Sequence, residues 1–522
     1  MIVEKDVLVP TRHGDPVAVD VFRPPDRGAH PVIVTMSPYG KDVHWPDRYP
    51  LYEQADQGPY AVWETPYPEW WVERGYALVR ADSPGTGKSP GCLDLLGEQE
   101  VNGYYDTVEW AAQQPWANGK AGALGISWLA ILQWYLAALQ PPHLAAIIPW
   151  EGMSDPYREF ARHGGILNNA FIRFWWDKQI APQQYGLGER SPEQLEAGKV
   201  DLLDGMRAHA FIDRWYEERT PDLSRITVPV LASANWGSLV LHHRGVLEAY
   251  RAVASECKQL VISSGTHIGP FYEDWAKQRQ LRFLDRWLKD ERNGAEDDPP
   301  VRLAVRSCGT HTWRDEHEWP LAQTRWTPLH LDATTRSLTW TPPAREGSVS
   351  YPAPEGEVAF TFQAEDEVEL TGPVALRLWV SSSTEDTDVF VHIHQVGPDG
   401  EEYHGIGPQG APLPLAMGWL RACHRELDTE RSLPYRPVHT HERAVPLVPG
   451  EPTPLDIEIW PTCIVLPAGH RLVVRIRGND DDLGVFAHDD PGDRDRDRLR
   501  GAVTVHTGGG YDSHLVVPVI PA

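Results

Sequence analysis

Short apolar runs, separated by helical patterns, dominate the first 150 positions of the chain. Residues 31–36, 76–81, 121–126 and 144–150 are each predominantly apolar, which predicts strands that are buried on both faces. Residues 98–114 instead place apolar side chains three or four positions apart, as in an amphipathic helix. Because such strands alternate with helices, the pattern predicts a parallel sheet covered on both faces.

The alternation stops between residues 157 and 225 and then returns. That stretch is helical, polar and aromatic by turns, without a strand signal, and we interpret it as a helical cap inserted into the sheet domain. The strand pattern resumes at 228–233 and again at 259–264, and a helix over 274–289 closes the domain.

From about residue 300 the chain changes to short runs in which apolar and polar residues alternate. Residues 374–380, 387–394 and 471–476 follow this pattern, and turn clusters such as 397–400 separate the runs. An antiparallel β-sandwich is predicted. The predicted organisation is therefore an α/β core over 1–156 and 226–298, a helical cap over 157–225, and a C-terminal all-β domain over 299–522.

Composition and charge narrow the class of protein. The 522 residues include 74 acidic and 48 basic side chains, which gives a formal net charge of −26. Such a surface disfavours nucleic acid and anionic membranes as partners, and no apolar stretch is long enough to span a bilayer. The five cysteines lie far apart without a C-x-x-C pair, which indicates reduced thiols. Because the chain opens without a basic and apolar leader, we expect a cytoplasmic protein.

One strand-to-helix junction carries candidate chemistry. The run 121–126 ends at Ser127, and apolar residues then recur at helical spacing over 128–139. A serine at such a sharp turn exposes its hydroxyl beside the first free N–H groups of a helix, as a nucleophile requires. Gly125 and Ala130 supply the small residues that the turn needs. The alternative interpretation is that Ser127 only caps the helix.

A nucleophilic serine also needs a general base and donors for the oxyanion. His267 comes directly after the apolar run that ends at Ser264. In α/β-hydrolases the catalytic residues occur along the chain in the order serine, acid, histidine, and the histidine follows a late strand. Tyr39 follows the strand 31–36, where a loop donor commonly completes an oxyanion hole, and the backbone N–H of Trp128 is the second donor. The alternative interpretation of Tyr39 is a packed loop aromatic.

Several motifs occur in an order that resembles a known group of enzymes. They are Ser37-Pro-Tyr-Gly-Lys, Asp82-Ser-Pro-Gly-Thr-Gly-Lys-Ser-Pro-Gly, Gly125-Ile-Ser-Trp-Leu-Ala and Asp155-Pro-Tyr-Arg. Together with the β domain they resemble the CocE/NonD hydrolases, the group of cocaine esterase and the X-prolyl dipeptidyl peptidases. The resemblance implies an α/β-hydrolase core with a helical cap insertion and a C-terminal jelly-roll-like sandwich. It implies Ser127 as nucleophile, His267 as base, and Tyr39 with the N–H of Trp128 as the oxyanion hole.

The acid that orients the histidine departs from the family pattern. After the strand 228–233 the family carries G-W-x-D, whereas Ser238 occupies the aspartate's position here. We therefore expect the acid at the end of the preceding strand. Glu151 lies there, between Ser127 and His267 in the chain, so the order nucleophile, acid, histidine is preserved.

Two alternatives to Glu151 stay open. Asp155 is the weaker one, because it belongs to a motif that relatives carry beside their usual aspartate, and the amide of Asn235 is another group that could orient the histidine. Glu151 itself could be a solvated loop acid. The turn at Ser127 also departs from the family pattern, because Ala130 stands where the family usually has a glycine. Alanine is also small, so this change does not argue against Ser127 as the nucleophile.

The histidine-rich positions do not make a recognisable metal site in the sequence. His242 and His243 are adjacent and are expected to point apart. His392 and His394 would share one face of a strand, but two ligands do not complete a site. We predict no metal and no organic cofactor.

The predicted function is hydrolysis of a carboxylic ester, or of an amide-like acyl bond, in a small-molecule substrate through an acyl-enzyme. One alternative is an X-prolyl or aminoacyl peptidase. Another is a degenerate homologue that binds a ligand without turnover, for which the missing aspartate is the main argument. The substrate stays open, and a homodimer is a further expectation from the resemblance.

Overall fold

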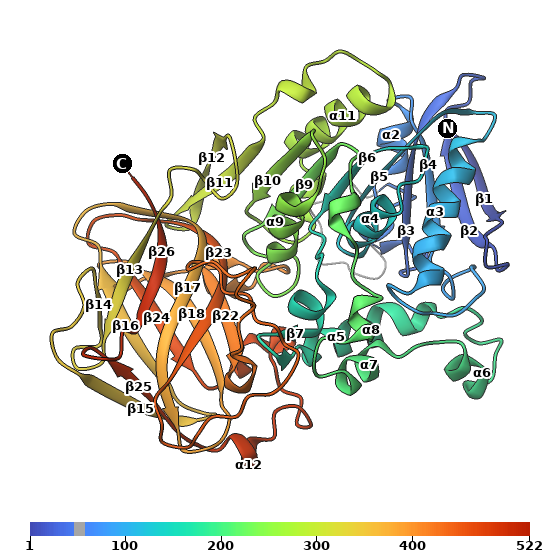
Figure 1. Cartoon of the computed structure of the whole chain (residues 1–522). Coiled ribbons are helices and arrows are strands. Elements are labelled where there is room, and N and C mark those ends of the chain that lie inside the picture. The colour runs from blue at the N-terminus through green and yellow to red at the C-terminus, as the bar shows by residue number, and fades with distance from the viewer. Residues whose placement is uncertain (46–57, 522) are drawn as a thin grey trace.

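The computed structural model describes residues 1–45 and 58–521, and Figure 1 shows an α/β part beside a β-rich part. We call residues 1–316 the α/β part and residues 325–521 the β-rich part. A mixed sheet with the order β1–β2–β4–β3–β5–β6–β9–β10–β11–β12 runs through the α/β part. All neighbours from β4 to β11 pair in parallel. The strands are β1 (Ile2–Val9), β2 (Val17–Arg23), β3 (His30–Ser37), β4 (Ala77–Asp82), β5 (Ala117–Ile126), β6 (Leu144–Trp150), β9 (Val230–Asn235), β10 (Lys258–Ser263), β11 (Val301–Ser307) and β12 (Thr310–Glu316).

Helices cover both faces of this sheet, which confirms the pattern read from the sequence. A Cβ at Gly125 of β5 would meet Leu129 of the following helix, α4, whereas one at Gly122 would meet Leu284 and Leu288 of α11. Since residues an odd number apart point to opposite faces of a strand, α4 and α11 lie on opposite sides. The helices of this part are α2 (Pro68–Val72), α3 (Glu98–Ala112), α4 (Trp128–Ala138), α9 (His243–Ala252), α10 (Gly269–Tyr272), α11 (Asp274–Leu288) and the short turn η5 (Ala295–Asp297).

Strand β11 extends the sheet of the α/β part, although its pattern assigns it to the β domain, and it also meets the β-rich part where Ser307 pairs in parallel with Val465. The run at residues 301–305 alternates like the strands of the β domain, but it pairs in parallel with β10, with Leu260 opposite Val301. β12 then adds to β11 in antiparallel fashion. Alternation reports which side chains are more buried and does not encode the partner strand, so the same pattern fits either part.

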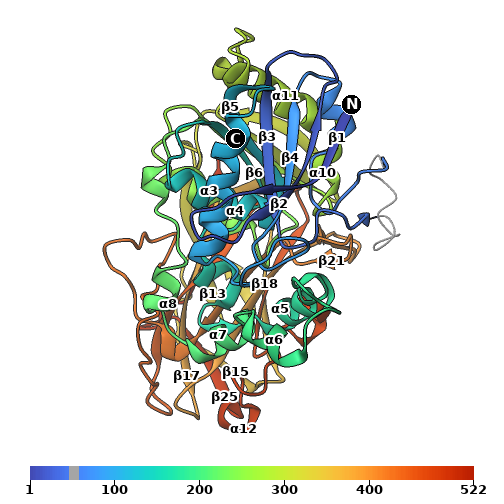
Figure 2. The same ribbon diagram turned by 90° about the vertical axis from the view of Figure 1, so that its right-hand side faces the viewer.

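Short helical segments fill the chain between β6 and β9, and Figures 1 and 2 show them below the sheet of the α/β part. One hairpin of two-residue strands, too short to give a periodic signal, interrupts them. The elements are η1 (Pro156–Ala161), β7 (Arg162–His163), β8 (Ile166–Leu167), α5 (Asn169–Trp175), η2 (Trp176–Ile180), η3 (Ala181–Gln183), α6 (Pro192–Ala197), α7 (Leu202–Ala208), α8 (Arg214–Glu217) and η4 (Leu223–Arg225). Within the described ranges, no helix is long and apolar enough to cross a membrane.

The β-rich part consists of antiparallel layers. One layer contains β13–β26–β17–β23 and another β16–β24–β18–β22, and apolar side chains from both, such as Leu376 and Val474, form one buried cluster. The longer strands are β13 (Arg325–Asp332), β15 (Gly347–Ala353), β16 (Glu357–Gln363), β17 (Val368–Ser382), β18 (Asp388–Val396), β22 (Ala416–Arg421), β23 (Thr453–Leu466), β24 (Arg471–Arg477), β25 (Gly501–Thr507) and β26 (His514–Ile520). The shorter elements are β14 (Ser337–Thr339), β19 (Glu402–Tyr403), β20 (Gly405–Ile406), β21 (Pro412–Leu413), η6 (Ala422–His424), η7 (Asp481–Phe486) and α12 (Arg496–Leu499).

Candidate active site

Ser127 occupies a strained turn between β5 and α4. Its φ and ψ are 57° and −118°, a region that residues with a side chain rarely adopt. The turn is held by the main chain: the Ser127 N–H donates to the carbonyl of Trp150 at 3.0 Å, and the Ser127 carbonyl accepts from the N–H of Ile131 at 2.8 Å. The side-chain hydroxyl is thereby free to make contacts of its own, as in a nucleophile elbow.

Small residues on both sides allow this turn to form. A Cβ at Gly125 would lie 2.5 Å from Leu129 Cβ, and one at Gly152 would lie 2.8 Å from Ala130 Cβ. Gly152, which follows β6, is therefore the residue that makes room for alanine at position 130. The Ala130 methyl group, which a glycine at this position would lack, therefore fits against Gly152 in the loop after β6.

The imidazole in contact with Ser127 is that of His242, directly before α9. His242 Nε2 lies 3.1 Å from Ser127 Oγ, and the N–H of Met153 donates to His242 Nδ1 at 3.3 Å. Burial, reinforced by the neighbouring His267, holds the pKa of His242 well below its ordinary value. A neutral ring that accepts at Nδ1 carries its proton on Nε2. His242 therefore donates to the Ser127 hydroxyl in this arrangement.

His267 is clamped between two carboxylates. Its Nδ1 lies 2.8 Å from Glu151 Oε2, and its Nε2 lies 3.0 Å from Glu64 Oε1. Burial by itself would lower the pKa of His267, but the two carboxylates outweigh it and raise the pKa to about 10. At neutral pH the resting site holds this ring as an imidazolium. Its face stacks on that of His242, with centroids 5.5 Å apart and planes at 14°.

Glu151 is fixed in place by the strand β9 beside it. The side chain is fully buried, the Glu151 N–H donates to the carbonyl of Ser233 at 2.7 Å, and Asn235 Nδ2 donates to Glu151 Oε1 at 3.0 Å. Asn235 also donates to the carbonyl of Gly265 at 3.1 Å. Its amide therefore holds the carboxylate and the loop that carries His267.

The other acid considered from the sequence points elsewhere. Asp155 accepts from the N–H groups of Tyr157 and Arg158 at 3.0 and 2.9 Å, and from Arg158 Nη1 at 2.8 Å, so it caps the segment η1. Ser238, in the aspartate's usual place, lines the same pocket as Ser127. The hydrogen bond that we expected between Ser127 and His267 is not formed among the described residues, where His242 takes that position.

Tyr39 and Trp128, the expected oxyanion donors, are both near the nucleophile: Tyr39 lines the same pocket, and Trp128 follows Ser127 in the chain. Tyr39 is in the wall of the Ser127 pocket, and its hydroxyl accepts from Trp175 Nε1 at 3.1 Å and hydrogen-bonds the Glu64 carboxylate. Trp128 is the first residue of α4, where backbone N–H groups have no partner within the helix. Most of the remaining wall is aromatic or apolar: Trp63, Phe171, Phe174, Trp175, Leu241, Pro408 and Phe486.

Comparisons with known proteins identify the family of the chain. Residues 13–269 match the X-Pro dipeptidyl-peptidase (S15 family), and residues 293–516 match the X-Pro dipeptidyl-peptidase C-terminal non-catalytic domain. The crystal structure of a CocE/NonD family hydrolase from Staphylococcus aureus has 32% sequence identity and a TM-score of 0.93, and the match covers 100% of this chain and 94% of that one. The chain belongs to the CocE/NonD hydrolase family.

Curated relatives of this CocE/NonD hydrolase agree. Cocaine esterase from Rhodococcus sp. is 25% identical in a match that covers 99% of this chain and 98% of its own length. A putative Xaa-Pro dipeptidyl-peptidase from Streptomyces avermitilis is 22% identical, with 90% and 77% covered. The resemblance read from the motifs is confirmed, as are the α/β-hydrolase fold and the β-rich C-terminal domain. The chain is a serine hydrolase of ester or amide bonds.

Sequence reasoning missed two residues of this site. His242 was considered only with His243 as a metal pair, although its place at the start of a helix after β9 could have suggested a position near the strand ends. Glu64 lies in a loop without a motif, and its φ of 63° turns the chain beside the elbow, where its carbonyl accepts from the N–H of Ile126 at 3.2 Å. No local signal marks such a loop residue.

Proposed function

We propose that this hydrolase cleaves carboxylic esters through an acyl-enzyme on Ser127, with His267 as general base and Glu151 as its orienting acid. The observation that carries the proposal is the 2.8 Å contact between His267 Nδ1 and the fully buried Glu151. A carboxylate at Nδ1 fixes the tautomer and stabilises the imidazolium that forms when the serine loses its proton. The likeness to cocaine esterase supports an ester as the scissile bond.

In the proposed reaction, His267 first releases its Nε2 proton to solvent water, and the neutral ring then turns its Nε2 from Glu64 to Ser127. Ser127 Oγ then attacks the carbonyl carbon while its proton passes to Nε2. The N–H of Trp128 donates to the oxygen that becomes negative, and the Tyr39 hydroxyl turns its proton from Glu64 to the same oxygen. His267 returns the proton to the departing alcohol. A water molecule, deprotonated in the same way, releases the carboxylic acid.

The contacts favour His267 over His242 as the base. His242 Nδ1 already accepts from the N–H of Met153, so a protonated His242 would set a donor against a donor in a buried site. Within the part of the chain that the structure describes, the hydrogen-bond partners of the His242 ring are Ser127 and Met153, and neither is a carboxylate. Its Nε2–H instead occupies one acceptor site on Ser127 Oγ, which leaves the hydroxyl proton free to point to His267.

The test is labelling and turnover. A fluorophosphonate probe should label the wild-type enzyme and fail to label Ser127→Ala, while p-nitrophenyl esters of graded acyl length should be hydrolysed by the first protein only. Folding of the variant is checked by its melting temperature. Labelling that persists in folded Ser127→Ala would exclude Ser127 as the nucleophile.

A peptidase of the X-prolyl or aminoacyl type is the second candidate. The match of residues 13–269 to the S15 family supports it, as does the carboxylate of Glu64 in the pocket wall, which could face a cationic substrate group. Prolyl and aminoacyl p-nitroanilides, measured beside the esters, separate the two. A higher kcat/KM for the anilides would favour the peptidase.

Other features are proposed on narrower support. The facing antiparallel layers of the β-rich part support a jelly-roll topology, and five free cysteines support a cytoplasmic location. The buried contact of Glu151 with His267 argues against a non-catalytic homologue, since it supplies the carboxylate that Ser238 does not. A homodimer stays a prediction, for which size-exclusion chromatography with light scattering is the check.

A further inference from the structure

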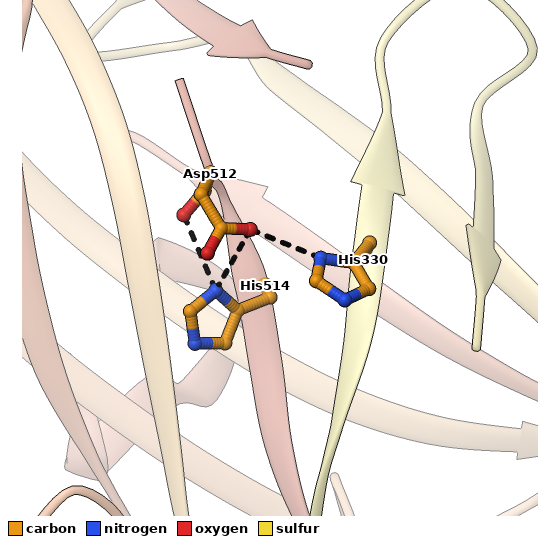
Figure 3. A group of neighbouring side chains, drawn as sticks. All are labelled: His330, Asp512 and His514. Atoms are coloured by element: carbon orange, nitrogen blue, oxygen red, sulfur yellow. Dashed lines mark hydrogen bonds and ion pairs between the residues drawn. The ribbon is translucent and has the colours of Figure 1, made fainter. Parts of the chain in front are cut away.

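A cluster of metal-ligand side chains lies in the β-rich part, away from the Ser127 pocket. Figure 3 shows His330, Asp512 and His514 with their polar atoms turned toward one another. His330 Nδ1 lies 3.0 Å from Asp512 Oδ1, and His514 Nδ1 lies 3.3 Å from the same oxygen. One ligand atom from each of the three residues can be chosen so that all lie within 4.8 Å of one another.

The sheet fixes the two histidines relative to each other. His330 of β13 pairs directly with His514 of β26, so their side chains project from the same face of adjacent antiparallel strands. Their ring centroids are 5.6 Å apart. Asp512 lies two residues before β26 begins at His514, between Tyr511, which forms a bridge with Gly508, and Ser513, whose carbonyl accepts from the N–H of Leu331 at 2.9 Å. The two histidines are therefore held by paired strands, and Asp512 is held by the bonded residues on either side of it.

We propose that His330, Asp512 and His514 bind a divalent first-row transition metal ion such as Zn²⁺. Two imidazole nitrogens and one carboxylate oxygen form a donor set that such ions favour. Each ring now donates its Nδ1 proton, His330 to the Asp512 carboxylate and His514 to the Asp512 main-chain carbonyl at 3.2 Å. On metal binding that proton moves to Nε2 of the same ring, so two neutral imidazoles ligate without net proton release.

The surroundings of the three residues are open to solvent and contain no uncompensated positive charge from Arg377. The Asp512 side chain is 59% exposed, so water can complete a tetrahedral set of four. Arg377 is the nearest cation by register, opposite His514 on β17, and its guanidinium is paired with Asp456 at 3.1 Å. The positive charge beside the site is therefore already compensated.

Two other groups in the described chain have metal-like donors but hold cations of their own. Asp6, Asp20 and Asp42 are bridged by Lys41, with 2.8 Å from its Nζ to Asp20 Oδ1. In the group of His394, Glu402 and His404, the Arg475 guanidinium lies 3.2 Å from Glu402. A bound ion at either position would have to displace a side-chain cation, whereas the His330 group has no such competitor within it.

The test uses the full chain after removal of metal with EDTA. Isothermal titration with Zn²⁺ should show one site per chain, and Co²⁺ should give the visible absorption of a four-coordinate ion. His330→Gln, His514→Gln and Asp512→Asn should each weaken Zn²⁺ binding by about 100-fold or more, because even loss of a partner that only supports a ligand costs about 10- to 100-fold. Zn²⁺ should raise the melting temperature of the wild type and not of these variants.

The matched control is His404→Gln, which alters the other histidine–glutamate group and should leave Zn²⁺ affinity unchanged. Ester hydrolysis and the melting temperature without metal report the folding of each variant. A wild-type chain that binds no Zn²⁺ would overturn the proposal. So would folded His330→Gln and His514→Gln variants that keep the wild-type affinity, or binding that is lost only in the His404 variant.

Discussion

The two carboxylates on His267 act on opposite sides of the ring. Glu151 contacts Nδ1, where a proton must stay throughout an acyl-transfer reaction, and Glu64 contacts Nε2, where the proton must come and go. The first contact supports catalysis and the second competes with Ser127 for the same nitrogen. Single substitutions at these positions therefore have different expected effects.

Glu151→Gln should lower kcat by about three to four orders of magnitude, because the amide can neither fix the tautomer nor stabilise the imidazolium. The amide keeps the shape of the side chain, so the melting temperature reports whether the fold is retained. Glu109→Gln is the matched control, since Glu109 pairs with His143 at 2.7 Å outside the pocket. A kcat within tenfold of the wild type in folded Glu151→Gln would reject the assignment.

Glu64→Gln should move the acid limb of the kcat/KM profile to lower pH. The pKa of His267 is raised to about 10 even though burial opposes the shift, and Glu64 supplies part of the rise. Removing that negative charge lowers the pKa, so the neutral ring required of a base persists at lower pH. A displacement of about one to three pH units is expected. An unmoved or raised limb in the pH profile would show that Glu64 does not control this proton.

Three residues of the site, Ser127, His267 and Glu151, can be proposed from the sequence. His242 and Glu64 cannot. Ser127 follows an apolar strand and starts a helix, and His267 and Glu151 each follow a strand directly, so pattern and chain order locate them. His242 and Glu64 reach the site through tertiary packing of a helix start and a loop. Their approach depends on backbone angles such as the φ of 63° at Glu64, which no spacing rule encodes.

At the scale of elements, the elbow depends on how closely the loop after β6 packs on α4. A Cβ at Gly152 would lie 2.8 Å from both the Ala130 Cβ and the Ala130 carbonyl carbon. Gly152→Ala should therefore reduce the free energy of unfolding by about 1 to 3 kcal/mol and lower kcat, because the helix that starts at Trp128 must shift.

Denaturant unfolding of Gly152→Ala measures this prediction, with Gly510→Ala as the control, because a Cβ at Gly510 would meet nothing within 4 Å and its φ is not positive. Adding Ala130→Gly should restore only part of the stability, because the clash with main-chain atoms remains. Unchanged stability in Gly152→Ala would mean that the packing at the elbow is looser than these distances imply. The strand expected near residue 301 is present as β11, but its alternation does not reveal its partner β10, which tertiary packing selects.

At the scale of the whole molecule, the β-rich part completes the active site. The N–H of His267 donates to the carbonyl of Pro408 at 2.9 Å, and Pro408 and Phe486 line the Ser127 pocket. Arg244 of α9 joins the parts, with Nη1 2.7 Å from Glu159 Oε1 and Nε 2.8 Å from Glu458 Oε1. The position of His267, the proposed base, therefore depends on both parts of the chain.

Arg244→Met should destabilise the protein by about 3 to 5 kcal/mol, because it leaves the buried Glu159 carboxylate without its cation. Arg251→Met, on the same helix, is the control: Arg251 is partly exposed, and its pair with Glu248 at 3.1 Å should contribute about 1 kcal/mol or less. Chemical denaturation measures both. Equal losses in the two variants would contradict the role given to the buried pair.

The identity of the base is the central claim, and the acylation rate tests it most directly. We would measure fluorophosphonate labelling of Ser127 by stopped-flow at several pH values in His267→Gln and in His242→Gln. The account predicts that His267→Gln slows acylation by three orders of magnitude or more, on the scale of about 10⁴ that loss of a triad member's function has in serine proteases. It predicts that His242→Gln, which removes only a donor to the hydroxyl, slows it far less. The reverse order, with His242→Gln the more damaging, would contradict it.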